Sequence, residues 1–463
     1  MRSVRASAPA LLAAALLACP LAPAAAAAPA GLDKIRHIVV VYLENHSFDN
    51  MFGLFPGADG LRGKGKHWAP QVDETGKPYA TLPPVMNTGV KPAVPDPRFP
   101  QDLPNAPFLI DKFVKLDEKT PDLVHRFYQN PAQIDGGRND KFALYSDAKG
   151  LTMGYYDTRT TRMWALAREF TLDDRYFMGA VGGSFLNHMW LVCACTPAFP
   201  GAPDKAKAQI DGDGKMVKDG MVTPDGFAVN TIYSVFQPHP ANADPAVALP
   251  PVANPSIGDR LNGKGVSWAW YSGGWNDALA GKVDQMKENA FQFHHQALAY
   301  FADLGDGTPG RAAHLKDEAD LYDAIAKGAL PSVVFYKPVG VENEHPGYAN
   351  VTNGDMRAAD VIDKIRRSKA WRSTVILVTY DENGGFWDHV PPPKGDRWGP
   401  GTRVPLIVVS PFAKRHFVDH KTYDTTAILR LIERRFRLDP LGGERTFPAE
   451  HSDNDLRHAL TLK

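Results

Sequence analysis

The chain has 463 residues, enough to bury a large core as one big domain or two ordinary ones. Its content of 44% hydrophobic and 22% charged residues is that of a globular protein, and its 52 basic and 52 acidic residues cancel. Zero net charge argues against a general electrostatic attraction to nucleic acid or to an anionic membrane. Composition leaves the oligomeric state unknown.

Residues 1–28 are predicted to be a secretory signal peptide, and residues 29–463 a single domain. A basic start, MRSVRAS, precedes an apolar run too short to span a membrane and a run of small residues suited to cleavage near Ala27 or Ala28. The alternative is a lipoprotein, because LLAC ends at Cys19 as a loose lipobox. No later stretch is apolar enough to span a bilayer, so we expect an exported protein, in the periplasm or the medium.

Strands and helices are expected to alternate after residue 37. In chain order they are a strand at 38–43, helices at 156–169 and 187–195, a strand at 266–271, a helix at 314–328, a strand at 331–336, a helix at 355–369, strands at 373–380 and 403–411, and a helix at 424–436. Two long irregular stretches, 56–110 and 197–255, are rich in proline and glycine. Apolar strands alternating with amphipathic helices indicate an α/β fold with a mainly parallel sheet covered on both faces.

Two cysteines remain after the signal peptide, Cys193 and Cys195 in LVCACTP. Cysteines two residues apart on one element are poorly placed to bridge each other. Nothing like a second Cys or His pair supports a metal site there, so we expect buried structural thiols.

Acidic and amide residues follow two of the apolar strands directly. IVVVYL runs into Glu44-Asn45, and VILVTY runs into Asp381-Glu382. Ligands bind beyond the carboxyl ends of parallel strands, so these side chains should meet at one edge of the sheet. Crowded carboxylates repel one another unless a cation lies among them, and an all-oxygen set suits Mg, Ca or Mn, with Zn possible. The sequence predicts one divalent metal ion, whereas the simpler alternative is a solvated turn.

A serine lies in a glycine-flanked turn, GGSFLNHMW, before a helix expected to begin near Asn187. Ser184 is therefore placed as an exposed nucleophile or an anion-binding group. The pattern is not G-x-S-x-G, which disfavours an acyl-transfer hydrolase. The alternative is that Ser184 only caps the helix.

Taken together and in this order, ENHSFDNMFG, SFLNH, DENGGFWDHV with GTRVPLIVVSP, and YDTTAILRLIERRF resemble the bacterial phosphoesterase family of secreted acid phosphatases and phosphatidylcholine-type phospholipases C. The resemblance covers most of the chain after residue 33. It implies an alkaline-phosphatase-like core and a phosphoesterase catalytic domain over residues 29–463.

The resemblance also implies roles for particular residues. Glu44, Asn45, Asp381 and Glu382 would hold the metal, and Ser184 would be the nucleophile and lie close to the metal. The residues around the phosphate would be Asn187, His345, His125 and Lys141. Asp388, His389 and Arg403 are expected to brace the turns around the site.

The sequence departs from the phospholipase pattern, commonly E-N-R-S-F-D and T-x-P-N-R. His46 and His188 replace the arginines, Ser184 the threonine and Leu186 the proline, which leans toward the acid phosphatase branch. We expect a secreted, metal-dependent phosphatase that hydrolyses phosphomonoesters through a phosphoserine intermediate, with an acidic pH optimum. The alternatives are a phospholipase C acting on a phospholipid head group and a non-catalytic exported binding protein.

Overall fold

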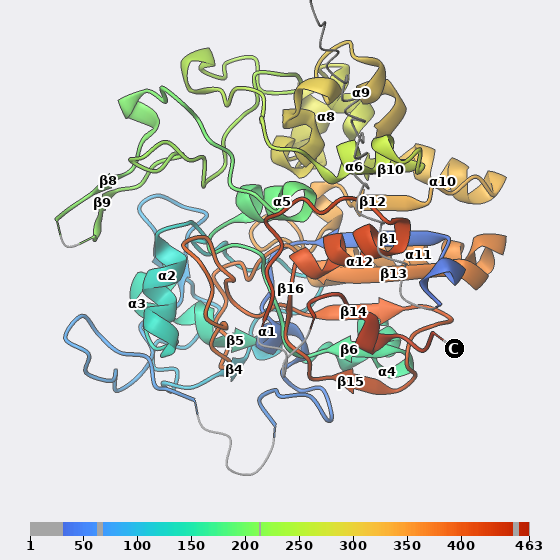
Figure 1. Ribbon diagram of the computed structural model, residues 1–463. Coiled ribbons are helices and arrows are strands. Elements are labelled where there is room, and N and C mark those ends of the chain that lie inside the picture. The colour runs from blue at the N-terminus through green and yellow to red at the C-terminus, as the bar shows by residue number, and fades with distance from the viewer. Residues whose placement is uncertain (1–30, 63–67, 213, 448–452, 463) are drawn as a thin grey trace, which may run out of the picture.

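The computed structural model describes residues 31–62, 68–212, 214–447 and 453–462, and its centre is an eight-stranded sheet (Figure 1). The strand order is β11-β10-β12-β1-β13-β14-β6-β15. Its strands are β1 (His37–Leu43), β6 (Thr171–Asp173), β10 (Trp268–Ser272), β11 (Leu315–Asp317), β12 (Val333–Lys337), β13 (Thr374–Tyr380), β14 (Leu406–Val409) and β15 (Phe417–Asp419). Within this sheet β14 is antiparallel to both neighbours and every other pair is parallel, so the predicted, mainly parallel α/β fold is confirmed.

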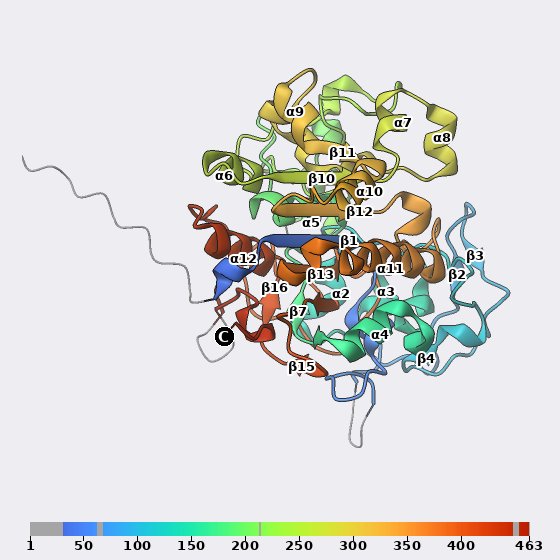
Figure 2. The same ribbon diagram turned by 90° about the vertical axis from the view of Figure 1, so that its right-hand side faces the viewer.

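Helices cover both faces of the sheet (Figures 1 and 2). On one side α11 packs against α4 and α10, and on the other α5 packs against α6 and α12. The bounds of these six are α4 (Arg162–Glu169), α5 (Ser184–Cys193), α6 (Ile257–Gly263), α10 (Glu318–Lys327), α11 (Val351–Arg367) and α12 (Thr426–Phe436). Because both faces are covered, all seven residues of β13 are buried.

Smaller elements lie outside this core. The helices are α1 (Phe48–Phe52), α2 (Gln129–Ile134), α3 (Phe142–Tyr145), α7 (Trp275–Leu279), α8 (Val283–Glu288) and α9 (Pro309–His314). The paired short strands are β2 (Met86–Asn87) with β3 (Val94–Pro95), β4 (Phe108–Leu109) with β5 (Gly154–Tyr155), β7 (Tyr176–Phe177) with β16 (Tyr423–Asp424), and β8 (Gln209–Ile210) with β9 (Met216–Lys218). In their described residues, the two long stretches predicted to be irregular, 56–110 and 197–255, hold only such short pieces and single turns of 3-10 helix.

Capping residues account for the places where the observed helix ends differ from the predicted ones. Helix α11 begins at Val351, four residues before the predicted start, because the side chain of Asn350 accepts a hydrogen bond from the Asn353 amide. The predicted helix at 314–328 starts as strand β11, and α10 ends as predicted at Gly328, which adopts the left-handed conformation.

The prediction of free thiols is wrong. Cys193 and Cys195 form a disulfide, and their Cα atoms are 5.1 Å apart. Helix α5 ends at Cys193, and Ala194 then takes a left-handed conformation with φ 47° and ψ 41°. Side chains two residues apart in a continuous helix do not face each other, so the reversal at Ala194 is what lets the two sulfur atoms meet.

The predicted signal peptide and the lipobox at Cys19 lie outside the described residues. Among the helices that the structure does describe, none is both long and apolar enough to cross a membrane.

Candidate active site

Two polar turns meet because the strands before them pair in register. In the parallel pair of β1 and β13, Leu43 lies opposite Tyr380, and the Asp381 amide donates to the Leu43 carbonyl at 3.1 Å. The next residues along each strand are therefore neighbours at the carboxyl edge of the sheet. These are Glu44, Asn45, Asp381 and Glu382, and all four are fully buried.

The two turns are in tight contact and carry backbone strain. Asn45 has φ of 110°, a conformation that non-glycine residues rarely adopt and that costs about 1–3 kcal/mol. Gly384 has φ of 60°, and a Cβ there would collide with the Asn45 carbonyl oxygen. Asn45 is thus held in a strained conformation directly beside the DENGG turn. Strain of this kind concentrates at functional sites.

Ser184 faces this cluster from the first residue of α5. The N-cap position is Gly183, and the Ser184 hydroxyl donates to Glu44 Oε2 at 3.0 Å and lies 3.5 Å from Asn45 Oδ1. The hydroxyl therefore does not cap its own helix, and α5 begins three residues before the predicted start. A Cβ on Gly182 would lie 2.8 Å from Phe127 Cα, so the glycines before Ser184 let the 125–127 segment approach the helix N-terminus.

The three carboxylates lack enough positive charge around them. The pKa of Asp381 is raised well above its usual range, mainly by burial and secondly by the negative charge of Glu44. The pKa of Glu382 is raised in the same way, mainly by burial and secondly by the negative charge of Asp381. Within the described part of the chain, Asp381 Oδ2 and Glu382 Oε1 are buried without a hydrogen-bond partner. Unpartnered buried carboxylate oxygens fit a hard cation, so the residues present suit a metal ion.

Sequence reasoning missed a buried lysine and a histidine beside Glu44. Lys337 Nζ contacts Glu44 Oε1, and His295 Nε2 lies 2.9 Å from the same oxygen. Burial alone would raise the pKa of Glu44, but the charges of His295 and Lys337 outweigh it and hold that pKa well below its usual range. Lys337 ends the apolar strand β12, so the strand-end rule could have found it. The adjacent pair His294-His295 lies in a short 3-10 helix, Phe293–His295, which no sequence pattern predicted.

A cavity of about 450 Å³ opens above Ser184. Three histidines, His125, His294 and His345, line it together with Arg126 and Tyr348. The long irregular stretches predicted from the sequence also supply wall residues, including Thr88, Lys91, Asn230 and Thr231.

The two histidines predicted from the sequence lie side by side in this cavity. The ring centres of His125 and His345 are 5.3 Å apart. His125 Nε2 is 3.3 Å from Asn45 Nδ2 and 3.7 Å from Glu382 Oε1, so it faces the carboxylate cluster. His345 Nδ1 contacts the Pro346 carbonyl oxygen, and burial lowers its pKa.

Two other predicted phosphate contacts are directed elsewhere. The Asn187 side chain accepts from the Ala180 amide at 2.9 Å and donates to the Gly182 and Gly183 carbonyls at 3.3 and 3.2 Å. It therefore shapes the turn before Ser184. Lys141 pairs with Asp135 at 3.1 Å and is not among the residues around the cavity.

A comparison with known families matches this chain over residues 35–439, and the match is to the phosphoesterase family. The chain belongs to that family. It is accordingly a hydrolase acting on phosphoric ester bonds, which confirms the predicted enzyme class.

Two of the curated relatives of this phosphoesterase are bacterial phospholipases C. Phospholipase C A of Mycobacterium tuberculosis is 26% identical over 445 residues, covering 88% of this chain and 74% of the relative. The non-hemolytic phospholipase C of Pseudomonas aeruginosa is 24% identical over 438 residues, covering 88% of this chain and 54% of the relative.

Among solved structures, murine ectonucleotide pyrophosphatase/phosphodiesterase 5 has a TM-score of 0.33 at 10% identity, covering 65% of this chain and 94% of that one. A protein in the alkaline phosphatase superfamily from Vibrio parahaemolyticus has a TM-score of 0.33 at 11% identity, covering 64% of each chain.

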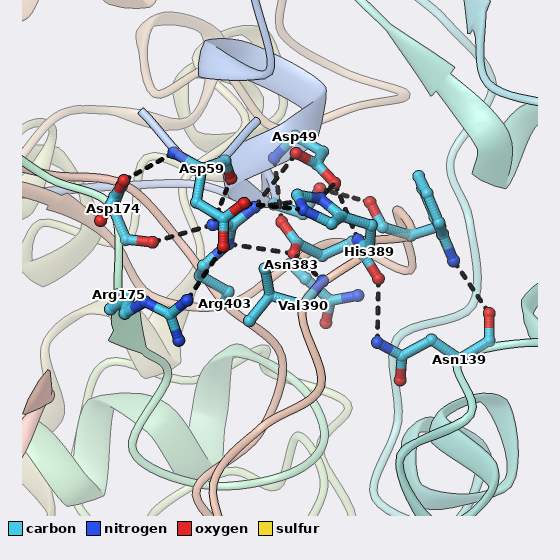
Figure 3. Close-up of polar contacts among 12 residues, drawn as sticks. Asp49, Asp59, Asn139, Asp174, Arg175, Asn383, His389, Val390 and Arg403 are labelled. Carbon is cyan, nitrogen blue, oxygen red and sulfur yellow. Dashed lines mark hydrogen bonds and ion pairs between the residues drawn. The ribbon is translucent and has the colours of Figure 1, made fainter. Parts of the chain in front are cut away.

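An ion network braces the two turns of the phosphoesterase site, as predicted for Asp388, His389 and Arg403. Figure 3 shows Asp49, His389 and Arg403 gathered in this network. Arg403 is fully buried and donates to Asp388 Oδ1 at 3.0 Å and to Asp49 Oδ1 at 3.1 Å. Asp49 lies in α1, just after Glu44-Asn45, and Asp388 follows the DENGG turn. His389 completes the network, because its Nδ1 is 2.6 Å from Asp49 Oδ2. Asp49, Asp388 and His389 also have metal-ligand spacing, but the Arg403 guanidinium and the His389 imidazolium already offset the two carboxylates.

The brace makes stability depend on the charge of His389. Burial lowers the pKa of His389, but the hydrogen bond and charge of Asp49 outweigh it and raise that pKa from 6.5 to about 9. Because the folded-state pKa is raised, the stabilisation is complete below pH 6.5 and is lost as pH rises through about 9. We therefore expect His389→Gln to cost about 2 kcal/mol more unfolding free energy near pH 7 than near pH 9.5.

Urea denaturation at both pH values measures this difference. The matched control is His239→Gln, because the hydrogen-bond partners of the His239 ring in the described structure are Gln237 and the Pro240 carbonyl, with no carboxylate among them. A stability deficit of His389→Gln that stays the same at both pH values would contradict the ion-pair interpretation.

Proposed function

We propose that this phosphoesterase is an exported, metal-dependent phosphatase that hydrolyses phosphomonoesters through a phosphoserine on Ser184, within a single catalytic domain over residues 29–463. The observation that carries the proposal is the contact of the Ser184 hydroxyl with Glu44 at the floor of the histidine-lined cavity. A hydroxyl at a helix N-terminus, beside oxygens suited to a cation, is placed to attack phosphorus.

One divalent metal ion would be held by Glu44, Asn45, Asp381, Glu382 and Ser184. When bound, it would make the serine hydroxyl more acidic and offset negative charge on the phosphoryl group. Oxygen donors favour Mg, Ca or Mn, and Zn is possible although it usually takes more nitrogen or sulfur ligands.

The chain's own residues would carry out two displacements. Ser184 passes its hydroxyl proton to Glu44 Oε2, to which it already donates, and Oγ forms a bond to phosphorus as the bond to the ester oxygen breaks. An imidazolium gives the departing ester oxygen a proton. Water then attacks the phosphoserine and gives one proton to the same imidazole, while Glu44 returns its proton to the departing Ser184 oxygen and inorganic phosphate is released. His125 and His294 stand on the cavity wall, where they can contact the non-bridging oxygens.

His345 is the best-placed proton donor for the leaving oxygen. Its Nδ1 contacts the Pro346 carbonyl oxygen, so Nε2 is the nitrogen that can exchange a proton with the substrate. Because burial lowers the pKa of His345, the imidazolium is populated only at acidic pH. This supports an acidic optimum.

The Cys193–Cys195 disulfide supports export independently of the signal sequence, because disulfides persist in oxidising compartments outside the cytosol. A phospholipase C is the second candidate function, favoured by the names of the curated relatives. The substitutions that lean away from it, His46 and His188, are both buried and do not line the cavity, so they cannot contact a head group directly. The binding-protein alternative is set aside by membership of a hydrolase family.

Two substrates separate the remaining candidates. We expect turnover of p-nitrophenyl phosphate by the metal-loaded wild type, and a loss of at least about 1,000-fold in Ser184→Ala because the nucleophile is absent. Thermal unfolding of the variant serves as the control for folding. Activity on p-nitrophenyl phosphorylcholine alone would establish the phospholipase C alternative, and full activity in Ser184→Ala would overturn the covalent mechanism.

The proton-donor role predicts dependence on the leaving group. His345→Gln should lower kcat/KM for phenyl phosphate by about 100-fold or more, and much less for p-nitrophenyl phosphate, whose leaving group needs little protonation. The alkaline limb of the kcat/KM profile, where His345 loses its proton, should also flatten. The matched variant is His125→Gln, which should slow both substrates alike because His125 faces Asn45 and Glu382. Equal losses for both substrates in His345→Gln would assign the proton to another group.

A further inference from the structure

A buried ammonium group lies beside the proposed metal site and is not used by the hydrolysis described above. Lys337 is fully buried at the end of β12. Its Nζ contacts Glu44 Oε1, lies 3.4 Å from the Leu43 carbonyl oxygen and stands 5.2 Å from the centre of the Tyr42 ring. Two acceptor oxygens and an aromatic face suit a cation that can only donate.

The two oxygens of Glu44 serve different neighbours. Oε2 accepts from the Ser184 hydroxyl at 3.0 Å, whereas Oε1 contacts Lys337 and His295. Glu44 therefore joins the metal position beside Ser184 to a second position beside Lys337.

The second position has the donor set of a metal site. One ligand atom from each of Glu44, His188 and His295 lies within 4.8 Å of the others, and all three residues are buried. His188 Nδ1 is 2.7 Å from the Ser184 carbonyl oxygen, and within the described residues its Nε2 has no hydrogen-bond partner. A metal-binding histidine usually donates a hydrogen bond to a carbonyl oxygen from one ring nitrogen and binds the metal through the other.

We propose that Lys337 is a fixed internal cation that takes the place of a second metal ion at Glu44, His188 and His295. The inference rests on the metal site of the proposed function. The charges support it, because Glu44, Asp381 and Glu382 carry three negative charges when ionised. The ammonium offsets one of them and a single divalent ion offsets the other two. A second divalent ion beside the ammonium would leave buried positive charge uncompensated, which is costly.

Metal stoichiometry tests the proposal without any activity measurement. Wild type, Lys337→Ala and the double variant Lys337→Ala with His188→Ala are dialysed against Zn²⁺, and bound metal is determined by elemental analysis. We expect one equivalent in the wild type, two in Lys337→Ala, and one again in the double variant, which lacks a ligand of the second position. Circular dichroism checks that each variant is folded.

The outcomes separate this inference from the proposed function. One equivalent in a folded Lys337→Ala, or two in the wild type, overturns the role of Lys337 and leaves the metal site beside Ser184 intact. No metal in the wild type contradicts the proposed function itself. If Lys337→Ala does not fold, anomalous scattering from wild-type crystals soaked in Mn²⁺ shows whether the second position binds metal. A single peak beside Ser184 supports the proposal, and a second peak beside Lys337 overturns it.

Discussion

Buried negative charge at one edge of the sheet is the constraint around which the site is organised. Parallel pairing of β1 with β13 in register places Glu44 next to Asp381, and Glu382 follows at once. All three carboxylates are fully buried, and Lys337 is the one lysine or arginine in direct ion contact with them in the described structure. A cluster of this kind is costly unless a cation completes it, so the same arrangement that destabilises the empty cluster favours metal binding.

The surrounding structure holds this unfavourable cluster in place. Arg403 bridges Asp49, after the first turn, to Asp388, after the second, and the strained Asn45 lies against Gly384 between them. The GG pair before α5 lets the His125 segment approach Ser184. The nucleophile, the carboxylates and the cavity histidines therefore come from separate parts of the chain, fixed by backbone contacts and a buried ion network. Such preorganisation is what electrostatic catalysis requires.

Sequence patterns predicted the parts of the site that depend on local rules. Glu44 and Asp381 were found because each follows an apolar strand, and Ser184 because glycines precede a helix. Orientation and long-range contact were beyond those rules. Asn187 stands one turn from Ser184, yet its amide is directed to the Ala180 and Gly182 backbone. His295 reaches Glu44 from a short 3-10 helix that is far away in sequence. The disulfide depends on the left-handed conformation of Ala194, which residue spacing does not reveal.

The most direct measurement of the central claim is thermal unfolding of wild type and Glu382→Gln, each with and without a saturating divalent metal ion. The substituted amide would keep an acceptor for the Gly384 N–H while removing one buried charge. We predict that the variant unfolds at a higher temperature than wild type without metal and at a lower temperature with metal, because the carboxylate is a cost in the empty cluster and a ligand in the filled one. A wild type whose unfolding temperature does not respond to metal, or a variant less stable than wild type in both states, would contradict the account.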